Sequence, residues 1–331
     1  MPPPPPDLSV CLVNHGNARL LRECLRSIFE HTRGPSFEVI VVDNHSSDDS
    51  VDLVRREFSS VRLLCNPSAR SYAPNMNQAL RAARGRFVAM MNDDTRLAGN
   101  ALGAMAAFLA GDPETGAVGP KLLNPDGSFQ IGPRGPITLW NLVCWDAGAD
   151  RLFPRSRLFG ALSMRSWDPD RSCDMHTASG ACLVVRREVL DTIGLLDETI
   201  PMGADDIDLS LRIRAAGWRL RYLADAQVIH HRSVSRSRTP VDSMLKHYAA
   251  LYAICARYRG RGAAATFRAW VTVGAGLRVV SWSVLRLLPR WRRSAPMRIR
   301  VAWNVMLANL RRDDRSASVD AAPHATELPS A

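Results

Sequence analysis

Three short polar segments have the residue types and positions to do chemistry. They are Asn-Asp-Asp at 92–94, Asp-Asp-Ile-Asp at 205–208 and His-His at 230–231. Carboxylates that follow a buried strand can hold a hard divalent cation against a diphosphate, and a neutral imidazole can complete the coordination. A partly desolvated carboxylate can also act as a general base. These segments therefore predict a metal-assisted reaction on a phosphorylated ligand.

Each segment also has a purely structural interpretation. Residues 92–94 could begin a turn or cap a helix at 98–109. The acids at 205–208 suit the first turn of a helix that begins near Asp205, and a His at the end of a strand is often structural. Three acids within four positions nevertheless exceed what capping requires, and two acidic segments in one chain strengthen the metal interpretation.

Four further residues are candidates for binding a ligand. Asp43 directly follows an apolar run and could accept from the imide N–H of a pyrimidine base or from a ribose hydroxyl; it could equally cap a helix that starts near 48–51. Arg70, in a polar loop, could contact a base or a phosphate, or simply be solvated. Gly180 and Ala181 precede a predicted strand, and small residues there allow a ligand close to the backbone.

The elements that must position these residues follow from alternating apolar patterns. Four short runs rich in β-branched residues predict strands, and the helical spacing between them predicts βαβ units. Strands that alternate with helices imply an α/β fold with a mostly parallel sheet. Ligands bind such a sheet at the carboxyl ends of its strands. The predicted strands are 8–13, 37–42, 61–65 and 87–91, and the predicted helices are 20–28 and 75–84.

The middle of the chain is less regular. Residues 116–120 predict another edge or turn, and residues 181–186 predict a further strand. Between them, residues 124–175 are rich in Pro, Gly, Trp and Arg, which favours a long, partly irregular insertion over the site. No early strand is followed by a GxGxxG sequence, which argues against a dinucleotide-binding fold.

Composition limits the class of protein. The chain has 331 residues, 46% of them hydrophobic, which is enough to bury a large core. Its 7 Cys form no CxxC pair and no metal-finger spacing, so we expect buried thiols in a reducing, cytoplasmic compartment. The opening MPPPPPD has neither the basic nor the apolar region of a secretory signal, and residues 1–7 predict a disordered lead.

The net charge of +11 is concentrated towards the C-terminus. Residues 236–312 contain fifteen Arg and one Lys against one Asp, a charge of +15 that leaves −4 on the rest of the chain. Such a segment predicts binding to nucleic acid or to an anionic membrane surface. No nucleic-acid-binding module is visible and the apolar content is high, so we expect the membrane surface and no nucleic acid. Residues 313–331 predict a disordered tail.

Residues 271–288 approach the length of a membrane span, but they contain Arg278 and Arg286. An Arg at the bilayer centre costs about 2.5–3.5 kcal/mol, which argues against a span. Apolar residues and Trp among many Arg instead suit amphipathic helices in the headgroup region. We therefore expect a peripheral protein on the inner face of the cell membrane, with a helical subdomain that has a basic solvated face as the alternative. The Trp residues are Trp270, Trp282, Trp291 and Trp303.

Taken in order, these strings resemble the inverting glycosyltransferases of family two, which have the GT-A (nucleotide-diphospho-sugar transferase) fold. The resemblance covers residues 8–235 and implies a GT-A domain there, followed by a basic helical region at 236–312. Each string alone is weak, whereas the whole series is specific. It comprises the first strand, VVDN, SYAPNMNQAL, MNDDT, SGACLVVRRE, DDIDLSLR with AAGW, and the His strand that ends in Ser235.

The resemblance implies roles for residues at the first acidic segment and around the nucleotide. MNDDT looks like the family's Asp-Xaa-Asp element, which here begins with Asn92. Asp94 is then the expected metal ligand, and Asp93 a contact to ribose or to the metal's surroundings. VVDN places Asp43 at the nucleobase, and Arg70 is expected at the base or phosphate.

The resemblance extends to the second acidic segment and the His pair. DDIDL is similar to the family's Glu-Asp-Xaa-Asp-Leu pattern, with Asp205 in place of Glu. Asp206 is then the expected base, Asp205 a contact to acceptor or donor sugar, and Gly180 and Ala181 neighbours of that sugar. Because Asp205 is shorter than Glu, the division of roles between the two carboxylates stays open. His230 falls where a metal-binding His is common.

The expected activity is inverting transfer of a sugar, assisted by Mg²⁺ or Mn²⁺, from a nucleotide-sugar donor to a polyprenyl-diphosphate-linked or other cell-surface glycan. The strings most resemble the rhamnosyltransferases, so dTDP-rhamnose is the preferred donor, with other hexosyl or galactofuranosyl donors as alternatives. A sugar nucleotidyltransferase would need a Gly-rich basic loop, of which VNHGNARL at 13–20 is a poor version. A non-catalytic scaffold is disfavoured because the acids are present.

Overall fold

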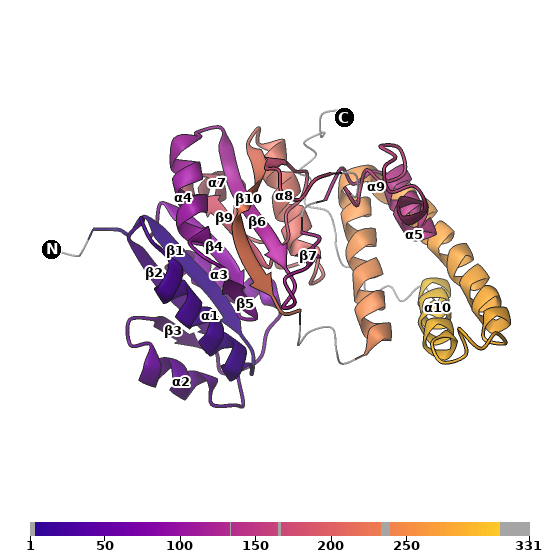
Figure 1. Ribbon diagram of the computed structural model, residues 1–331, viewed down its shortest axis with the longest axis horizontal. Coiled ribbons are helices and arrows are strands. Elements are labelled where there is room, and N and C mark those ends of the chain that lie inside the picture. Colours follow the sequence, from indigo (N-terminus) through magenta and orange to yellow (C-terminus); the bar gives the residue numbers. More distant parts are fainter. Residues whose placement is uncertain (1–3, 133, 165–166, 233–238, 312–331) are drawn as a thin grey trace. The chain divides into compact units, whose positions relative to one another are not determined.

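The computed structural model describes residues 4–132, 134–164, 167–232 and 239–311. They form two compact units (Figure 1). Of the described residues, those within 1–134, 167–198 and 205–232 belong to the first unit, and those within 135–166, 199–204 and 233–331 to the second. The predicted tail at 313–331, Ser235 and residues 1–3 of the predicted lead lie outside the described residues. From Asp7 onward the chain is held, because the Asp7 carboxylate accepts from the backbone N–H and the hydroxyl of Ser36.

A mixed sheet with helices on both faces forms the first unit. Its strand order is β3-β2-β1-β4-β9-β6-β10-β5, and the short β7 and β8 pair with β6 and β10. β1 to β4, β6 and β10 run in one direction, whereas β9 and β5 run against them. The strands are β1 (Leu8–Asn14), β2 (Phe37–Asp43), β3 (Arg62–Cys65), β4 (Phe87–Asn92), β5 (Thr95–Leu97), β6 (Thr115–Leu123), β7 (Phe129–Gln130), β8 (Cys173–Asp174), β9 (Cys182–Arg186) and β10 (Arg219–His230).

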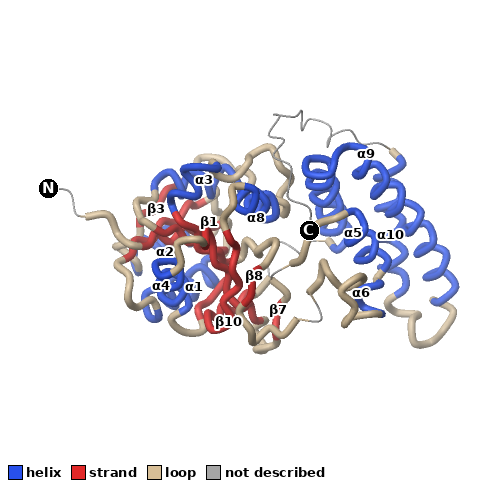
Figure 2. Tube along the Cα trace, turned by 90° about the horizontal axis from the view of Figure 1, so that it is seen from above, coloured by secondary structure: helices blue, strands red, loops and turns tan. Residues whose placement is uncertain are grey.

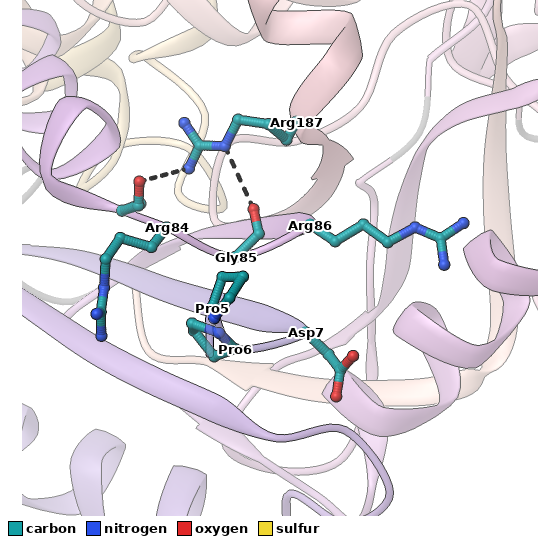
Figure 3. A pocket seen from close by; sticks show the side chains of 8 residues that line it. Pro5, Pro6, Asp7, Arg84, Gly85, Arg86 and Arg187 are labelled. Carbon is teal, nitrogen blue, oxygen red and sulfur yellow. Dashed lines mark hydrogen bonds between the residues drawn. The ribbon is translucent and has the colours of Figure 1, made fainter. Parts of the chain in front are cut away.

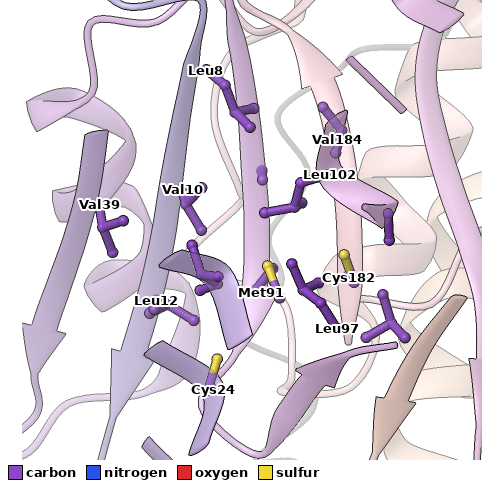
Figure 4. Packing of buried hydrophobic residues seen from close by; sticks show 14 of the residues in the cluster. Leu8, Val10, Leu12, Cys24, Val39, Met91, Leu97, Leu102, Cys182 and Val184 are labelled. Carbon is purple, nitrogen blue, oxygen red and sulfur yellow. The ribbon is translucent and has the colours of Figure 1, made fainter. Parts of the chain in front are cut away.

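Two hydrophobic clusters, one on each face, hold the sheet. Successive side chains of a strand point to opposite faces, so Val10 and Leu12 belong to one cluster and Cys11 to the other. Figure 4 shows the cluster that contains Val10, and Figure 2 shows α3 and α8 on one side of the sheet and α1 and α4 on the other. The helices of this unit are α1 (Ala18–His31), α2 (Ser50–Glu57), α3 (Tyr72–Ala82), α4 (Ala101–Gly111), α7 (Arg187–Ile193) and α8 (Asp205–Ala215).

The predicted α/β class and the first four strands are confirmed, each strand to within one residue at either end. β1, β2 and β4 are buried on both faces, and such strands appear in a sequence as continuous apolar runs. The predicted edge or turn at 116–120 is wrong, because β6 lies inside the sheet between β9 and β10. Its Pro120 cannot donate to a ladder, and the neighbouring strand accommodates it with an irregularity between Leu223 and Gln227.

Helices dominate the second unit. They are α5 (Leu139–Ala147), α6 (Ala149–Leu152), α9 (Pro240–Leu285) and α10 (Ala295–Leu310). α9 is broken at Gly260, whose φ of 88° and ψ of 159° are not helical. The buried carboxylate of Asp146 on α5 accepts from Tyr248 Oη at 2.6 Å and from Arg278 Nη2 at 2.8 Å, which ties α5 to both halves of α9. The placement of the insertion over the site stays a prediction.

Two more expectations concern the cysteines and the membrane. All seven Cys are free, but the expectation that they are buried is wrong for Cys65, which is exposed, and for Cys173, which is half-buried. Cys65 ends β3 at the sheet margin, where one neighbouring strand is absent. Among the described helices, none is both long and apolar enough to cross a bilayer.

Candidate active site

The predicted site residues of the first unit gather at the carboxyl edge of the sheet. In the parallel register Asn14 lies opposite Asp43, and Asn92 lies opposite Val13, so β1, β2 and β4 end in one row. The antiparallel β9 begins at this edge, where the Asn92 N–H donates to the carbonyl of Ala181 at 3.0 Å. This edge is where ligands bind in open α/β sheets.

Asp93 and Asp94 form the turn between β4 and β5. The Thr95 hydroxyl donates to the Asn92 carbonyl at 2.7 Å, and the His231 N–H donates to the Asp94 carbonyl at 3.0 Å. The turn is therefore fixed from both sides. The alternative that these acids cap a helix at 98–109 is wrong, because β5 intervenes and α4 starts only at Ala101.

The two carboxyl groups in this turn repel each other. Burial and then the charge of Asp94 raise the pKa of Asp93 to about 7, although the side chain of Asn17 and the N–H of His15 donate to it and oppose the rise. A cation at this turn would reverse the effect, because it favours the charged form of both acids. The edge is thus preorganised to receive positive charge.

β10 ends at His230, which lies beside the same turn. Its Nε2 lies 3.3 Å from Oδ1 of Asp94, and the two side chains are only 13% and 12% exposed. The other ring nitrogen, Nδ1, lies 2.7 Å from Oε1 of Gln130. Which nitrogen carries the proton therefore depends on the orientation of the Gln130 amide.

A chain of hydrogen bonds fixes that orientation. Asp126 can only accept, so the Ser128 hydroxyl donates to it at 2.6 Å and in turn accepts from Asn124 Nδ2 at 2.9 Å. The Asn124 oxygen is then left to accept from Gln130 Nε2 at 2.9 Å, and Gln130 Nε2 also donates to the carbonyl of His230 at 3.1 Å. Gln130 Oε1 therefore faces His230, whose Nδ1 must carry the proton.

With Nδ1 protonated, a ring that carries no second proton points the lone pair of Nε2 at the Asp94 carboxylate. Two acceptors 3.3 Å apart are satisfied by a shared cation, or otherwise by a proton on Nε2. A carboxylate oxygen and an imidazole nitrogen are ligands that suit a divalent ion such as Mn²⁺. No set of three or more His, Cys, Asp or Glu side chains suited to a metal exists in the described part of the chain, so a diphosphate and water would supply the remaining ligands.

Replacing Gln130 with Leu tests this arrangement. We expect the affinity for Mn²⁺ to fall about 10–100-fold, because the partner that orients a ligating His is lost. Isothermal titration of Mn²⁺ into the protein with a nucleoside diphosphate present measures the affinity. Gln227→Leu, at an exposed position on β10, the strand that carries His230, should bind Mn²⁺ as the unaltered chain does. An unchanged affinity in Gln130→Leu would contradict the assigned tautomer.

α8 brings the second acidic segment to the edge. The Asp206 carboxylate accepts from the Gly180 N–H at 2.9 Å and from the Ile207 N–H at 2.8 Å. One turn on, the Ser210 hydroxyl accepts from the Ala178 N–H and donates to the Asp206 carbonyl. A Cβ on Gly180 would lie 3.1 Å from Cβ of Asp206, a tight contact that would press on the acid. Glycine therefore leaves room for this carboxylate.

Asp206 has the properties of a general base. Burial, and then the charge of Asp205, raise its pKa to about 6, against the hydrogen bonds from Gly180 and Ile207 and the charge of Arg134. A carboxyl group with this pKa is ionised at neutral pH yet holds a proton better than an ordinary Asp. Asp205 is buried beside it at the start of α8.

The third acid of this segment is structural. Asp208 is fully buried and pairs with Arg212 Nε at 2.7 Å. The Arg212 guanidinium also donates to the carbonyls of Ile193, Gly194 and Leu195, so the pair fixes the loop after α7. The structural interpretation of the acids at 205–208 therefore holds for one of the three.

Breaking this pair should destabilise the first unit. Asp208→Ala is expected to lower the free energy of unfolding by about 3–5 kcal/mol, because it removes the fully buried carboxylate and leaves a half-buried guanidinium without its charge partner. Urea denaturation followed by circular dichroism measures the change. Asp191→Ala, which removes an exposed acid from α7, should stay within about 0.5 kcal/mol. A similarly small change for Asp208→Ala would contradict the structural assignment.

Asp43 ends β2, and Arg70 lies in the loop between β3 and α3 at the same edge. Asp43 does not cap α2, so that alternative is wrong; its carboxylate accepts from Asn14 Nδ2 at 2.9 Å and from the Ser46 N–H at 3.0 Å. The Asn44 amide holds the backbone of Arg70 by accepting from its N–H at 2.7 Å and donating to its carbonyl at 2.9 Å. The Arg70 side chain is exposed.

Sequence reasoning missed three residues at this edge. Asn44 is part of the VVDN string, but its hydrogen bond to the backbone of Arg70 joins residues 26 positions apart. Gln130 sits in a segment of weak periodicity, and no spacing relates it to His230. Tyr72, at the start of α3, is held neutral because burial and then the charges of nearby Asp205 and Asp206 raise its pKa well above the usual value. Tyr72 could have been found from its position in the SYAPNMNQAL string, where it begins the helix.

A surface pocket lies elsewhere on the first unit (Figure 3). It is lined by residues that precede β1 and β4, such as Asp7 and Gly85, and by Arg187, which follows β9. This is the amino edge of the parallel strands, opposite the edge at which such sheets bind ligands. The Arg187 guanidinium donates to the carbonyls of Gly85 and Ala83, so it serves the fold.

Comparison with known proteins bears on the same edge. A family model described as "Glycosyl transferase family 2" matches residues 9–194. A solved mannosyltransferase from Pyrobaculum calidifontis, in complex with GDP-Man and Mn²⁺, superposes with a TM-score of 0.56 at 19% identity, covering 93% of this chain and 88% of that one. At this identity the likeness concerns the fold.

Curated relatives also match by sequence. "Uncharacterized protein y4gI" of Sinorhizobium fredii is 33% identical over 70% of this chain, and "O-antigen biosynthesis protein RfbC" of Myxococcus xanthus is 30% identical over 70%. The chain spans 25% and 18% of their lengths. The "N-acetylglucosaminyl-diphospho-decaprenol L-rhamnosyltransferase" of Mycobacterium tuberculosis is 27% identical over 74% of this chain and 82% of its own.

Proposed function

The chain belongs to glycosyl transferase family 2, and on this premise we propose that it is an inverting glycosyltransferase that moves a sugar from a nucleotide-sugar donor to a hydroxyl of a glycan acceptor. The observation that carries the proposal is the shared edge: Asp94 and His230 face each other at 3.3 Å, and Asp206, a buried acid with a raised pKa, accepts from Gly180 at this edge. A cation site and a base are the two parts that such a transfer needs.

In the proposed reaction each residue has one task. A divalent cation, when bound, supplies charge neutralisation to the departing nucleoside diphosphate. Asp94 and His230 would hold it, and Gln130 orients His230. Asp206 takes the proton of the acceptor hydroxyl, which attacks the anomeric carbon from the face opposite the leaving group. The configuration inverts in one displacement, without a covalent intermediate on the protein.

The nucleotide is proposed to lie across the ends of β1 and β2. Asp43 would accept from the imide N–H of a pyrimidine base, because each carboxylate oxygen has two lone pairs and Oδ2 uses one of them to accept from the Ser46 N–H. Arg70 would contact the base or phosphate from a backbone that Asn44 fixes. Asp93 would accept from the ribose, and Asp205 and the Gly180–Ala181 backbone would contact the sugar.

For the donor we propose dTDP-rhamnose, and for the acceptor a polyprenyl-diphosphate-linked saccharide. Support comes from the relative that is named an N-acetylglucosaminyl-diphospho-decaprenol L-rhamnosyltransferase, 82% of whose length this chain covers, and from the relative named for O-antigen biosynthesis. An acceptor of this kind is held in a membrane. We therefore also propose that the protein works as a peripheral protein on the inner face of the cell membrane.

Product analysis tests the proposed donor. The full chain is incubated with Mn²⁺, a polyprenyl-diphosphate-linked N-acetylglucosamine and one nucleotide sugar at a time. The mass of the lipid product is then measured by mass spectrometry. The proposal predicts addition of one deoxyhexose from dTDP-rhamnose in preference to transfer from UDP-hexoses or UDP-galactofuranose. Transfer of a different sugar would overturn the rhamnose assignment, and the absence of transfer from every donor would overturn the proposed activity.

A further inference from the structure

We propose that one face of the second half of α9, together with the turn that follows it, is a docking surface for an anionic lipid membrane. The role of this surface rests on the proposed function: it would hold the enzyme at the membrane in which a lipid-linked acceptor lies.

The first component is an apolar stripe on α9, formed by Trp270, Val273, Leu277, Val280 and Val284. Its members follow one another at intervals of three and four residues, so they share one face of the helix. All five are solvent-exposed, from 43% at Trp270 to 66% at Leu277. Leu287 and Leu288, just beyond the helix, extend the apolar surface and are 77% and 51% exposed.

The opposite face of the same helix is already occupied. Phe267, Val271 and Ala275 are buried at 0%, 0% and 1% exposure, and Arg278 on this face bonds to Asp146 of α5. At 3.6 residues per turn these positions lie on the side of α9 away from the apolar stripe. A surface helix of a globular domain normally has one apolar face, and a helix that is apolar on two faces is typical of burial on both. The apolar stripe therefore needs a second apolar neighbour.

The second component is a basic tip, formed by Arg286, Arg290, Arg292 and Arg293 between α9 and α10, all of them exposed. Two Trp support it: the rings of Trp282 and Trp291 meet edge to face with centroids 5.4 Å apart. Arg298 lies over Trp282 at 4.4 Å and Arg290 over Trp291 at 5.1 Å. Aromatic rings that carry guanidinium groups suit the boundary between headgroups and acyl chains.

Charge decides between a membrane and a second copy of the chain. Residues 257–311 contain twelve Arg and no Lys, Asp or Glu. Two copies pairing through the apolar stripe would bring these like charges together without a compensating acid, which opposes association. An anionic lipid surface supplies both the apolar layer for the stripe and phosphates for the tip. Spanning is not required, because an amphipathic helix lies in the plane of the interface.

Vesicle co-sedimentation of the full chain tests the proposal. Vesicles of phosphatidylcholine alone are compared with vesicles that also contain phosphatidylglycerol. The tip variant carries Arg290→Gln, Arg292→Gln and Arg293→Gln, and the stripe variant carries Val273→Gln, Leu277→Gln and Val280→Gln. A matched control, Arg55→Gln with Arg56→Gln and Arg171→Gln, removes three exposed Arg from the first unit. Circular dichroism verifies that each variant is folded.

We expect the unaltered chain to sediment with anionic vesicles and to be released by salt. The tip variant should bind about a hundredfold more weakly, since each Arg contributes about fivefold, and the stripe variant about tenfold or more. The control should bind within about twofold, because its Arg lie off the surface.

Three results would overturn the proposal. The first is failure of the unaltered chain to bind anionic vesicles. The second is an equal loss in the control, which would indicate net charge without a specific surface. The third is a dimer in light scattering that the stripe variant dissociates while its vesicle binding is unchanged, which would assign the stripe to self-association. Nucleoside diphosphate release is measured without vesicles, so a failure of the proposed enzymatic activity can be distinguished from a failure of membrane binding.

Discussion

Replacing Asp206 with Asn is expected to lower the rate of sugar transfer about 10²–10⁴-fold, because the amide cannot take the proton of the acceptor hydroxyl. Nucleotide-sugar binding should change little, since the metal ligands and the nucleotide contacts lie on other elements. Single-turnover rates at saturating donor measure the first quantity, and isothermal titration with the donor measures the second. A transfer rate within about threefold of the unaltered chain would be inconsistent with a base at this position.

Asp205→Asn is the matched control, since it changes the neighbouring acid in the same helical turn. It should keep measurable activity and change the pH dependence. In the unaltered chain transfer should rise with pH through about 6, as Asp206 loses its proton. The charge of Asp205 contributes to the raised pKa of Asp206, so its removal should move this rise to lower pH. The opposite pattern, with Asp205→Asn inactive and Asp206→Asn active, would exchange the two roles.

The second large effect is expected for Asp94→Asn. The change removes the carboxylate whose Oδ1 lies 3.3 Å from Nε2 of His230. We expect much weaker Mn²⁺ binding and, at a fixed Mn²⁺ concentration, a loss of transfer of about a thousandfold, since metal assistance is worth several kcal/mol in the transition state. Mn²⁺ affinity can be followed by electron paramagnetic resonance with a nucleoside diphosphate present, independently of turnover.

Asp93→Asn, in the same turn, separates loss of a ligand from loss of charge. With a cation bound both acids are charged, so each variant removes one negative charge from the loaded site, but of the two only Asp94 faces His230. The Asp93 variant should therefore keep most of its Mn²⁺ affinity and lose less activity. Equal losses of Mn²⁺ affinity in the two variants would show that the turn attracts the ion by charge alone.

The sequence was most informative where burial on both faces left little choice of residue. β1, β2 and β4 are nearly continuous apolar runs, and the polar residues that end them, such as Asp43 and Asn92, mark the carboxyl edge. Once the strands were predicted to be parallel, those ends had to meet. The clustering of the first acidic segment with Asp43 could thus be predicted without coordinates.

What could not be predicted depends on contacts between distant residues. Gln130 meets His230 across 100 positions, through a two-residue strand that no periodicity identifies. β6 was misjudged because Gly and Pro obscure an interior strand whose neighbour adjusts to Pro120. The acids Asp206 and Asp208 have the same side chain, and only the Gly180 N–H beside one and the Arg212 guanidinium beside the other distinguish a base from a structural ion pair.

The central claim is that the carboxyl edge of the sheet is a metal-assisted glycosyl-transfer site. The most direct test is release of nucleoside diphosphate from dTDP-rhamnose and other nucleotide sugars by the full chain, with Mn²⁺ and with a chelator, beside Asp94→Asn and Asp206→Asn. The claim predicts release that requires acceptor and Mn²⁺ and is reduced at least about a hundredfold in both variants. Release that persists in both variants would place the chemistry elsewhere, and no release from any donor in the presence of a lipid-linked acceptor would contradict the claim.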